Sequence, residues 1–272
     1  MSNEKPIGIF DSGFGGLTVA RAVMDLLPAE DVVYFGDTAR YPYGPKPLNE
    51  VREFAFQIVE YLINEHDVKL LVVACNTAAA AALDDLSAEI SVPIIGVIAP
   101  GTQAAIDVSR TGLIGVIGTV GTVNSGAYKR AFSTLSDDEI QPLTLACPGF
   151  VEFVEKGESS GEQLQVLAER LLAPIVSANV DTLLLGCTHY PYLARVIGQV
   201  VGSDVVLVSS ADETAFEVSR QLTEMDLLAE EEKDGKRVFI SSGDVSWFAE
   251  VGERLFGPEL ASAQAHEWNP ST

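Results

Sequence analysis

Short apolar runs alternate with amphipathic segments along most of this chain. Strand-like runs occur at 7–10, 32–35, 68–74 and 94–98, and helix-like segments at 17–27, 50–65 and 77–86. Glycine and proline separate them, most densely in an irregular loop at 36–47. Apolar strands that alternate with helices are typical of parallel sheets covered on both faces. The sequence therefore predicts an α/β fold.

A second series of elements repeats the first, with a strand at 115–119, a helix at 124–132 and a closing strand at 205–208. The spacing from Asp11 to Cys75 nearly equals that from Thr119 to Cys187. This duplication predicts two pseudo-symmetric domains, each a mostly parallel sheet flanked by helices, with the active site in the crevice between them.

We expect a first domain of residues 1–99 plus 209–256 and a second domain of residues 100–208. A helix at 212–225 and a strand at 238–241 would return to the first domain. Residues 228–235, with three consecutive glutamates, are expected to form a solvated loop. Residues 257–272 would form a C-terminal tail, loosely held from residue 261 onward.

Two cysteines occupy matching places in the two halves. Cys75 and Cys187 each end an apolar strand and begin a polar turn. Because strand C-termini face the ligand crevice in open α/β sheets, two closing halves would bring both sulfurs to opposite sides of one substrate. A helix N-terminus after each cysteine would lower the pKa of its thiol. Cys147 has no symmetric partner, and we expect it to pack as a small apolar residue.

Polar residues surround the two thiols. His189 lies two residues after Cys187, and Asp11 opens the first glycine loop, so each thiol has a group that could hold its proton, although a lone histidine is often only packed. Hydroxyl and amide side chains occur at the same turns, namely Ser12, Asn76, Thr77, Thr119 and Thr188. Each is also an ordinary N-cap residue, but together with backbone N–H groups they could bind carboxylates.

The composition limits the possible partners. The 272 residues include 39 acidic and 17 basic side chains, which give a formal charge of −22. Nucleic acid and anionic membranes are therefore poor candidates as main partners. No signal-type segment and no run of about 18 apolar residues is present, and three cysteines do not make a disulfide framework. We expect a cytoplasmic protein with free thiols.

Motifs for cofactors and metals are weak. The glycine loop Gly13–Gly16 follows a strand, but the third glycine of a dinucleotide-binding fingerprint would fall at Thr18. Cys187 and His189 lack a second Cys/His pair to complete a zinc site, and no lysine has a context suited to a Schiff base. We therefore expect no metal and no cofactor. A nucleotide-dependent oxidoreductase and a two-lobed binding protein for acidic amino acids remain as alternatives.

Four sequence blocks resemble the signature blocks of the glutamate racemases, in the aspartate/glutamate racemase superfamily. These blocks are Asp11–Val19, Ala39–Lys46, Val73–Ala78 and Leu185–Pro191. The similarity extends to about residue 256, and the Tyr41–Pro45 segment favours glutamate over aspartate racemases. The resemblance implies a homodimeric, cofactor-independent isomerase that interconverts L- and D-glutamate and supplies D-glutamate for peptidoglycan synthesis. A racemase of a related acidic amino acid such as aspartate is the alternative.

The resemblance also implies residue roles. Cys75 would take the α-proton of D-glutamate and Cys187 that of L-glutamate, with the opposite thiol returning a proton. Asp11 would assist Cys75, and His189 would assist Cys187. Glu155 matches an acidic helper, although Glu152 lies close in sequence. Substrate contacts would come from Asp11, Ser12, Tyr43, Gly44, Asn76, Thr77, Thr119, Thr188 and His189.

Overall fold

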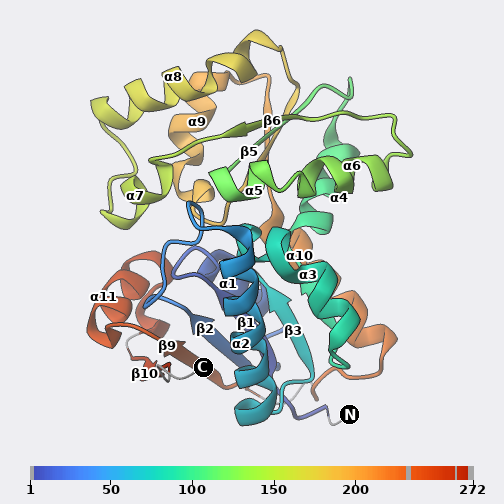
Figure 1. Cartoon of the computed structure of the whole chain (residues 1–272), viewed down its shortest axis with the longest axis vertical. Coiled ribbons are helices and arrows are strands. Elements are labelled where there is room, and N and C mark those ends of the chain that lie inside the picture. The colour runs from blue at the N-terminus through green and yellow to red at the C-terminus, as the bar shows by residue number, and fades with distance from the viewer. Residues whose placement is uncertain (1–2, 231–233, 261, 269–272) are drawn as a thin grey trace.

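The computed structural model describes residues 3–230, 234–260 and 262–268, which form two lobes (Figure 1). The first lobe contains strands β1 (Ile7–Asp11), β2 (Val32–Gly36), β3 (Leu70–Val73), β4 (Ile94–Gly96), β9 (Arg237–Ser241) and β10 (Gln264–Ala265). The second contains β5 (Ile114–Gly118), β6 (Leu143–Ala146), β7 (Thr182–Gly186) and β8 (Val206–Ser209). The strand pairs described in both sheets are parallel. The predicted α/β fold is confirmed.

Helices cover the sheets of both lobes (Figure 1). Those of the first lobe are α1 (Leu17–Leu26), α2 (Leu48–His66), α3 (Asn76–Glu89), α10 (Ser210–Glu224) and α11 (Val245–Phe256). Helix α4 (Ile98–Val108) follows β4. The helices of the second lobe are α5 (Val120–Asn124), α6 (Ala127–Leu135), α7 (Phe150–Glu155), α8 (Glu162–Ser177) and α9 (Ala194–Val201). Helix α10 packs against both α1 and α4. Within the described residues, no helix is both long enough and apolar enough to cross a membrane.

The two sheets share one topology. The first has the strand order β10-β9-β2-β1-β3-β4, and the second has the order β6-β5-β7-β8. Strands β2-β1-β3-β4 therefore correspond to β6-β5-β7-β8, and each sheet reverses its direction of winding between two central strands. Ligand sites in open α/β sheets lie outside the carboxyl ends of the strands at such a switch point. Cys75 follows β3 and Cys187 follows β7, so the cysteines occupy equivalent switch-point positions.

Two predicted elements differ from the structure. The strand expected at 94–98 ends at Gly96, because α4 begins at Ile98 and buries its apolar face. Apolar residues suited to a buried strand also suit a buried helix, and the pattern alone does not separate them. The helix expected at 124–132 is divided into α5 and α6, because Gly126 takes a left-handed conformation with φ of 70°.

The C-terminal residues contradict the expectation of a loosely held tail. Strand β10 pairs with β9 at the edge of the first sheet, and the indole of Trp268 donates a hydrogen bond to Asp37. Strand pairing and aromatic packing fix this segment, although its polar composition resembles a loop. Part of the loop expected at 228–235, residues 231–233, lies outside the described residues, as do residues 261 and 269–272.

Candidate active site

A cavity of about 100 Å³ lies between the carboxyl ends of the two sheets. Ten of the predicted site residues line it: Ser12, Tyr43, Gly44, Cys75, Asn76, Thr77, Thr119, Cys187, Thr188 and His189. The other two, Asp11 and Glu155, contact residues of the cavity wall. The switch points of both sheets thus bring together residues that are far apart in the sequence.

The first thiol lies among residues of the first lobe. Cys75 is the N-cap residue of α3, and its thiol donates a hydrogen bond to Oγ of Ser12 over 3.8 Å. Burial raises the pKa of Cys75 to about 12, and the charge of Asp11 adds to this rise, while N–H groups of Ala78 and Ser12 oppose it. The lowered pKa expected for Cys75 is therefore wrong in this arrangement, because desolvation of the thiolate outweighs the helix N-terminus.

Asp11 connects the first lobe to the turn after β7. It is fully buried at the end of β1, and its carboxylate accepts hydrogen bonds from N–H of Gly13 (2.8 Å) and from Oγ1 of Thr188 (3.3 Å). Burial raises the pKa of Asp11 above its ordinary value, although the charge of His189 and these hydrogen bonds oppose the shift. The charge of Asp11 therefore adds to the raised pKa of Cys75, and its carboxylate binds the turn that carries Cys187.

The second thiol has a histidine partner. Nε2 of His189 lies 3.1 Å from Oε1 of Glu155, and the imidazole also forms a hydrogen bond with Cys187. Burial alone would lower the pKa of His189, but the interactions with Cys187, Glu155 and Asp11 raise it to about 10. The imidazole is therefore protonated near neutral pH. Of the two acidic candidates, Glu155 contacts His189, whereas Glu152 lines the cavity.

A close approach of the two lobes depends on a glycine. A side chain at Gly15 would clash with Oγ1 of Thr188 and the ring of His189. The glycine loop after β1 thus lets the turn that carries Cys187 pack directly against the first lobe. This loop has a packing role between the lobes, in addition to beginning α1.

Polar side chains at the start of α3 reach across to the second lobe. Nδ2 of Asn76 donates to Oη of Tyr128 (2.8 Å), and Oγ1 of Thr77 lies 2.9 Å from Oγ1 of Thr119. Oδ1 of Asn76 is buried and, within the described residues, has no hydrogen-bond partner. This part of the wall therefore combines a helix N-terminus, which favours anions, with an acceptor for a ligand N–H group.

The loop after β2 forms another part of the cavity wall. Residues 41–45 line the cavity, and the hydroxyl of Tyr43 donates its proton to Asp37. The hydroxyl proton of Tyr43 is thus engaged by Asp37. The carbonyl of Gly44 accepts a hydrogen bond from N–H of Gly121 (2.9 Å), which joins this loop to the second lobe.

Some residues of the site were not singled out from the sequence. Cys147, expected only to pack, is buried but also lines the cavity, and burial followed by the charge of Cys187 raises its pKa to about 12. Asp37 and Tyr128 support the wall through hydrogen bonds. Asp37 follows β2 just as Asp11 ends β1. Its position at the end of a predicted strand could therefore have indicated a site residue from the sequence. Within the described residues, no three His, Cys, Asp or Glu side chains gather as a metal site.

Comparison with known proteins defines the class. Residues 17–217 match the family model described as Asp/Glu/Hydantoin racemase. The chain is therefore an isomerase of the amino-acid racemase type and belongs to the Asp/Glu/hydantoin racemase family.

The nearer relatives define the branch of that family. The glutamate racemase of Corynebacterium diphtheriae is 49% identical over 262 residues, which cover 96% of this chain and 98% of the relative. That of Mycobacterium leprae is 50% identical over 260 residues, which cover 95% and 94%. The predicted resemblance is confirmed, and the chain lies among the glutamate racemases.

Solved structures agree with this placement. A glutamate racemase isoform from Bacillus anthracis superimposes with a TM-score of 0.92 at 42% identity and covers 98% of both chains. The glutamate racemase from Francisella tularensis, solved in complex with D-glutamate, has a TM-score of 0.89 at 33% identity and covers 99% of this chain and 100% of its own. The two-lobed architecture is therefore that of this family.

Proposed function

We propose that the protein interconverts L- and D-glutamate, with Cys75 and Cys187 as the two groups that transfer the α-proton. The observation that supports this most directly is that both cysteines, from equivalent strand ends of opposite lobes, line one cavity. Near full-length similarity to glutamate racemases, one of which was solved with D-glutamate, supports the choice of substrate.

The two thiols have neighbours of different charge. The raised pKa of about 12 keeps Cys75 as a neutral thiol, whereas the protonated His189 is a suitable partner for a Cys187 thiolate. In this state Cys187 accepts the α-proton of L-glutamate, and Cys75 donates its own proton to the opposite face, which yields D-glutamate. The enzyme is then a Cys75 thiolate and a Cys187 thiol, ready for the reverse reaction on D-glutamate.

The chemical barrier is large because an α-proton next to a carboxylate is far less acidic than a thiol. Proton transfer by placed groups contributes about 10²- to 10⁴-fold, so positioning and electrostatic stabilisation must supply the rest. The protonated His189 supplies positive charge near the reacting proton, and the start of α3 faces a substrate carboxylate. Asn76, Thr77, Thr119 and Thr188 are the side chains we assign to substrate binding, with Ser12 and the backbone at Tyr43 and Gly44.

We expect contacts between the lobes to exclude water from the cavity. Hydrogen bonds join Thr77 to Thr119, Asp11 to Thr188 and Gly44 to Gly121, and each pair crosses the crevice. Opening of the crevice must break these bonds to release product, so we expect domain motion during turnover. We further propose that the chain works as a homodimer, without a cofactor, and supplies D-glutamate for peptidoglycan synthesis.

The direct test is incubation of the purified protein with L-glutamate in D₂O, without added cofactor, followed by chiral chromatography with mass detection. D-glutamate that carries one deuterium is the expected product, because the donated proton comes from a thiol in exchange with solvent. L-aspartate is the parallel substrate that tests the related racemase. Thermal stabilisation by L-glutamate without inversion would contradict racemisation and support the binding-protein alternative.

A further inference from the structure

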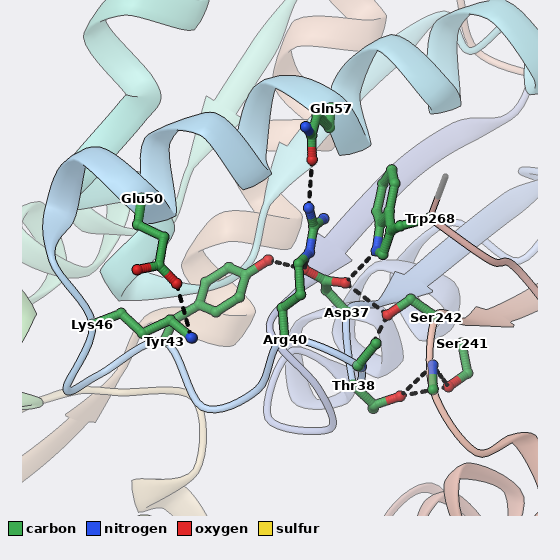
Figure 2. A network of polar contacts seen from close by, with 12 residues as sticks. Asp37, Thr38, Arg40, Tyr43, Lys46, Glu50, Gln57, Ser241, Ser242 and Trp268 are labelled. Carbon is green, nitrogen blue, oxygen red and sulfur yellow. Dashed lines mark hydrogen bonds and ion pairs between the residues drawn. The ribbon is translucent and has the colours of Figure 1, made fainter. Parts of the chain in front are cut away.

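A buried carboxylate lies behind the part of the cavity wall that we call the substrate loop, residues 38–47. Asp37 precedes this loop at the carboxyl end of β2 (Figure 2). Its side chain is fully buried. It does not line the cavity. A buried carboxylate is costly unless hydrogen bonds and opposite charge compensate for lost hydration. The hydrogen-bond donors to Asp37 therefore indicate which part of the structure this buried carboxylate stabilises.

Four side chains from different parts of the chain donate to Asp37. Oδ1 accepts hydrogen bonds from Oγ of Ser242 (2.6 Å) and from Nε1 of Trp268 (2.9 Å). Oδ2 accepts from Nε of Arg40 (2.7 Å) and from the hydroxyl of Tyr43. Two of these donors belong to the substrate loop, and two belong to the C-terminal region after β9 (Figure 2). The carboxylate thus joins the loop to the C-terminal segment.

Trp268 makes a second contact with the loop. Its ring lies 3.9 Å from the guanidinium carbon of Arg40, which also lies 4.1 Å from the ring of Phe54. The indole therefore binds the carboxylate through its N–H group and the cation through its ring face. Arg40 is held between two aromatic rings and, through Nη1, also bonds Gln57. These contacts of Arg40 restrict the conformation of the first residues of the substrate loop.

Further bonds fix both ends of the substrate loop. Oγ1 of Thr38 lies 2.7 Å from Oγ of Ser241 in β9, and the carbonyl of Gly44 accepts from N–H of Gly121 in the second lobe. Burial and the charge of Asp37 raise the pKa of Tyr43 well above its ordinary value, so its hydroxyl remains a proton donor. A continuous series of contacts therefore runs from the C-terminal segment, through Asp37 and the loop, to the opposite lobe.

We propose that Asp37 and Trp268 are positioning residues for the substrate, which act through Tyr43 and Arg40 to hold the substrate loop in its binding conformation. This inference rests on the proposed racemase function and concerns the same cavity. The loop would contact substrate and transition state alike, so its displacement should raise KM more than it lowers kcat. Residues that serve only folding would instead lower Tm without changing KM.

Conservative variants test this role. Trp268→Phe keeps an aromatic ring over Arg40 but removes the N–H donor, and Asp37→Asn keeps the shape but removes the charge. We expect KM for both glutamate enantiomers to rise about 10-fold in Asp37→Asn and about 3-fold in Trp268→Phe, with kcat within about 2-fold of wild type. Glu267→Gln, at the exposed neighbour of Trp268, is the matched control and should leave KM unchanged.

Two further measurements separate positioning from folding. A double-mutant cycle of Asp37→Asn with Tyr43→Phe should be non-additive in KM, because the first change weakens and the second removes the same hydrogen bond. The chain has two tryptophans, so Trp247→Phe leaves Trp268 as the only indole, and D-glutamate should then change its fluorescence.

Defined results would overturn the inference. One is a Trp268→Phe variant whose Tm is lowered but whose KM stays within about 2-fold of wild type. This variant tests the positioning role even if Asp37→Asn does not fold. Another is an emission of Trp268 that does not respond to D-glutamate in an active Trp247→Phe enzyme. Failure of the proposed function is distinct, because wild-type protein would then show no racemisation at all.

Discussion

The two halves of the cavity have the same topology but different chemistry. Cys75 follows β3 beside the hydroxyl of Ser12 and the charge of Asp11, whereas the equivalent Cys187 follows β7 beside the imidazole of His189, which is paired with Glu155. Burial with an anion nearby favours a neutral thiol, and a cation nearby favours a thiolate. The duplicated scaffold thus places two equivalent sulfurs among neighbours of different charge.

Thermodynamics limits how this difference can appear in kinetics. Enantiomers have equal free energy in water, so the equilibrium constant of racemisation is one. The ratio kcat/KM must therefore be equal in the two directions for wild type and for every variant. Within any one enzyme, the difference between the half-sites can appear only in kcat and KM taken separately, in pH dependence and in isotope exchange, whereas a variant and wild type can also differ in kcat/KM.

The largest effect is expected from removal of either thiol. Cys75→Ala and Cys187→Ala should each lower racemisation in both directions by about 10³-fold or more, because either change leaves one face of the substrate without a proton-transfer group. Chiral chromatography measures this loss. In D₂O, Cys75→Ala should still exchange the α-proton of L-glutamate without inversion, and Cys187→Ala that of D-glutamate. Exchange of the opposite enantiomers would reverse the assignment of the two bases.

Removal of the polar neighbours should separate the two half-sites. His189→Asn should lower kcat/KM by about 10²-fold, because it removes the cation beside Cys187. Ser12→Ala removes a neutral acceptor beside Cys75 and should cost about 10-fold or less. Steady-state assays in both directions provide the comparison. Equal losses in the two variants would show that the half-sites are chemically equivalent.

A smaller effect with a defined pH dependence is expected at Glu155. Burial opposes protonation of His189, but Cys187 and Glu155 raise the pKa of its imidazole to about 10. Glu155→Gln removes one of these interactions, so the imidazole should lose its proton at lower pH. The basic limb of the kcat/KM profile should therefore move down by about one pH unit or more. Glu152→Gln is the matched control, and a shift in that variant alone would make Glu152 the acidic helper.

The smallest effect on activity is expected at Asp181, which supports the second lobe away from the cavity. Its carboxylate accepts hydrogen bonds from Ser109, Thr111, Thr182 and N–H of Arg110, which outweigh burial and hold its pKa well below the ordinary value. Asp181→Ala should lower the free energy of unfolding by about 3 kcal/mol, because several donors lose their acceptor.

The pH dependence of stability follows from the sign of this shift. A lowered pKa in the folded state means that the contribution of Asp181 is complete above its ordinary pKa of about 4 and is lost as pH falls below it. Denaturation at pH 7 and at pH 3 should therefore show a smaller difference between wild type and Asp181→Ala at the lower pH. A difference that does not depend on pH, or a changed kcat/KM, would contradict this structural role.

The sequence alone was sufficient to predict the class of fold and many of the residues that line the cavity. Alternation of apolar strands and helices predicted the parallel sheets, and parallel strands place their carboxyl ends at one edge, so Cys75, Cys187 and the hydroxyl residues beside them could be assigned to one crevice. The four signature blocks indicated the family, which the comparisons confirm. These features are local in sequence, which is why they could be recognised without coordinates.

Long-range packing decided the rest. The raised pKa of Cys75 depends on burial and on Asp11, and the protonation of His189 depends on Cys187 and on Glu155 from helix α7. The polar C-terminal segment gave no sign in sequence that Trp268 reaches Asp37 behind the substrate loop. The sequence determined which groups lie at the strand ends, whereas only tertiary structure decided their charge and support, because desolvation and hydrogen bonding arise between segments that are distant along the chain.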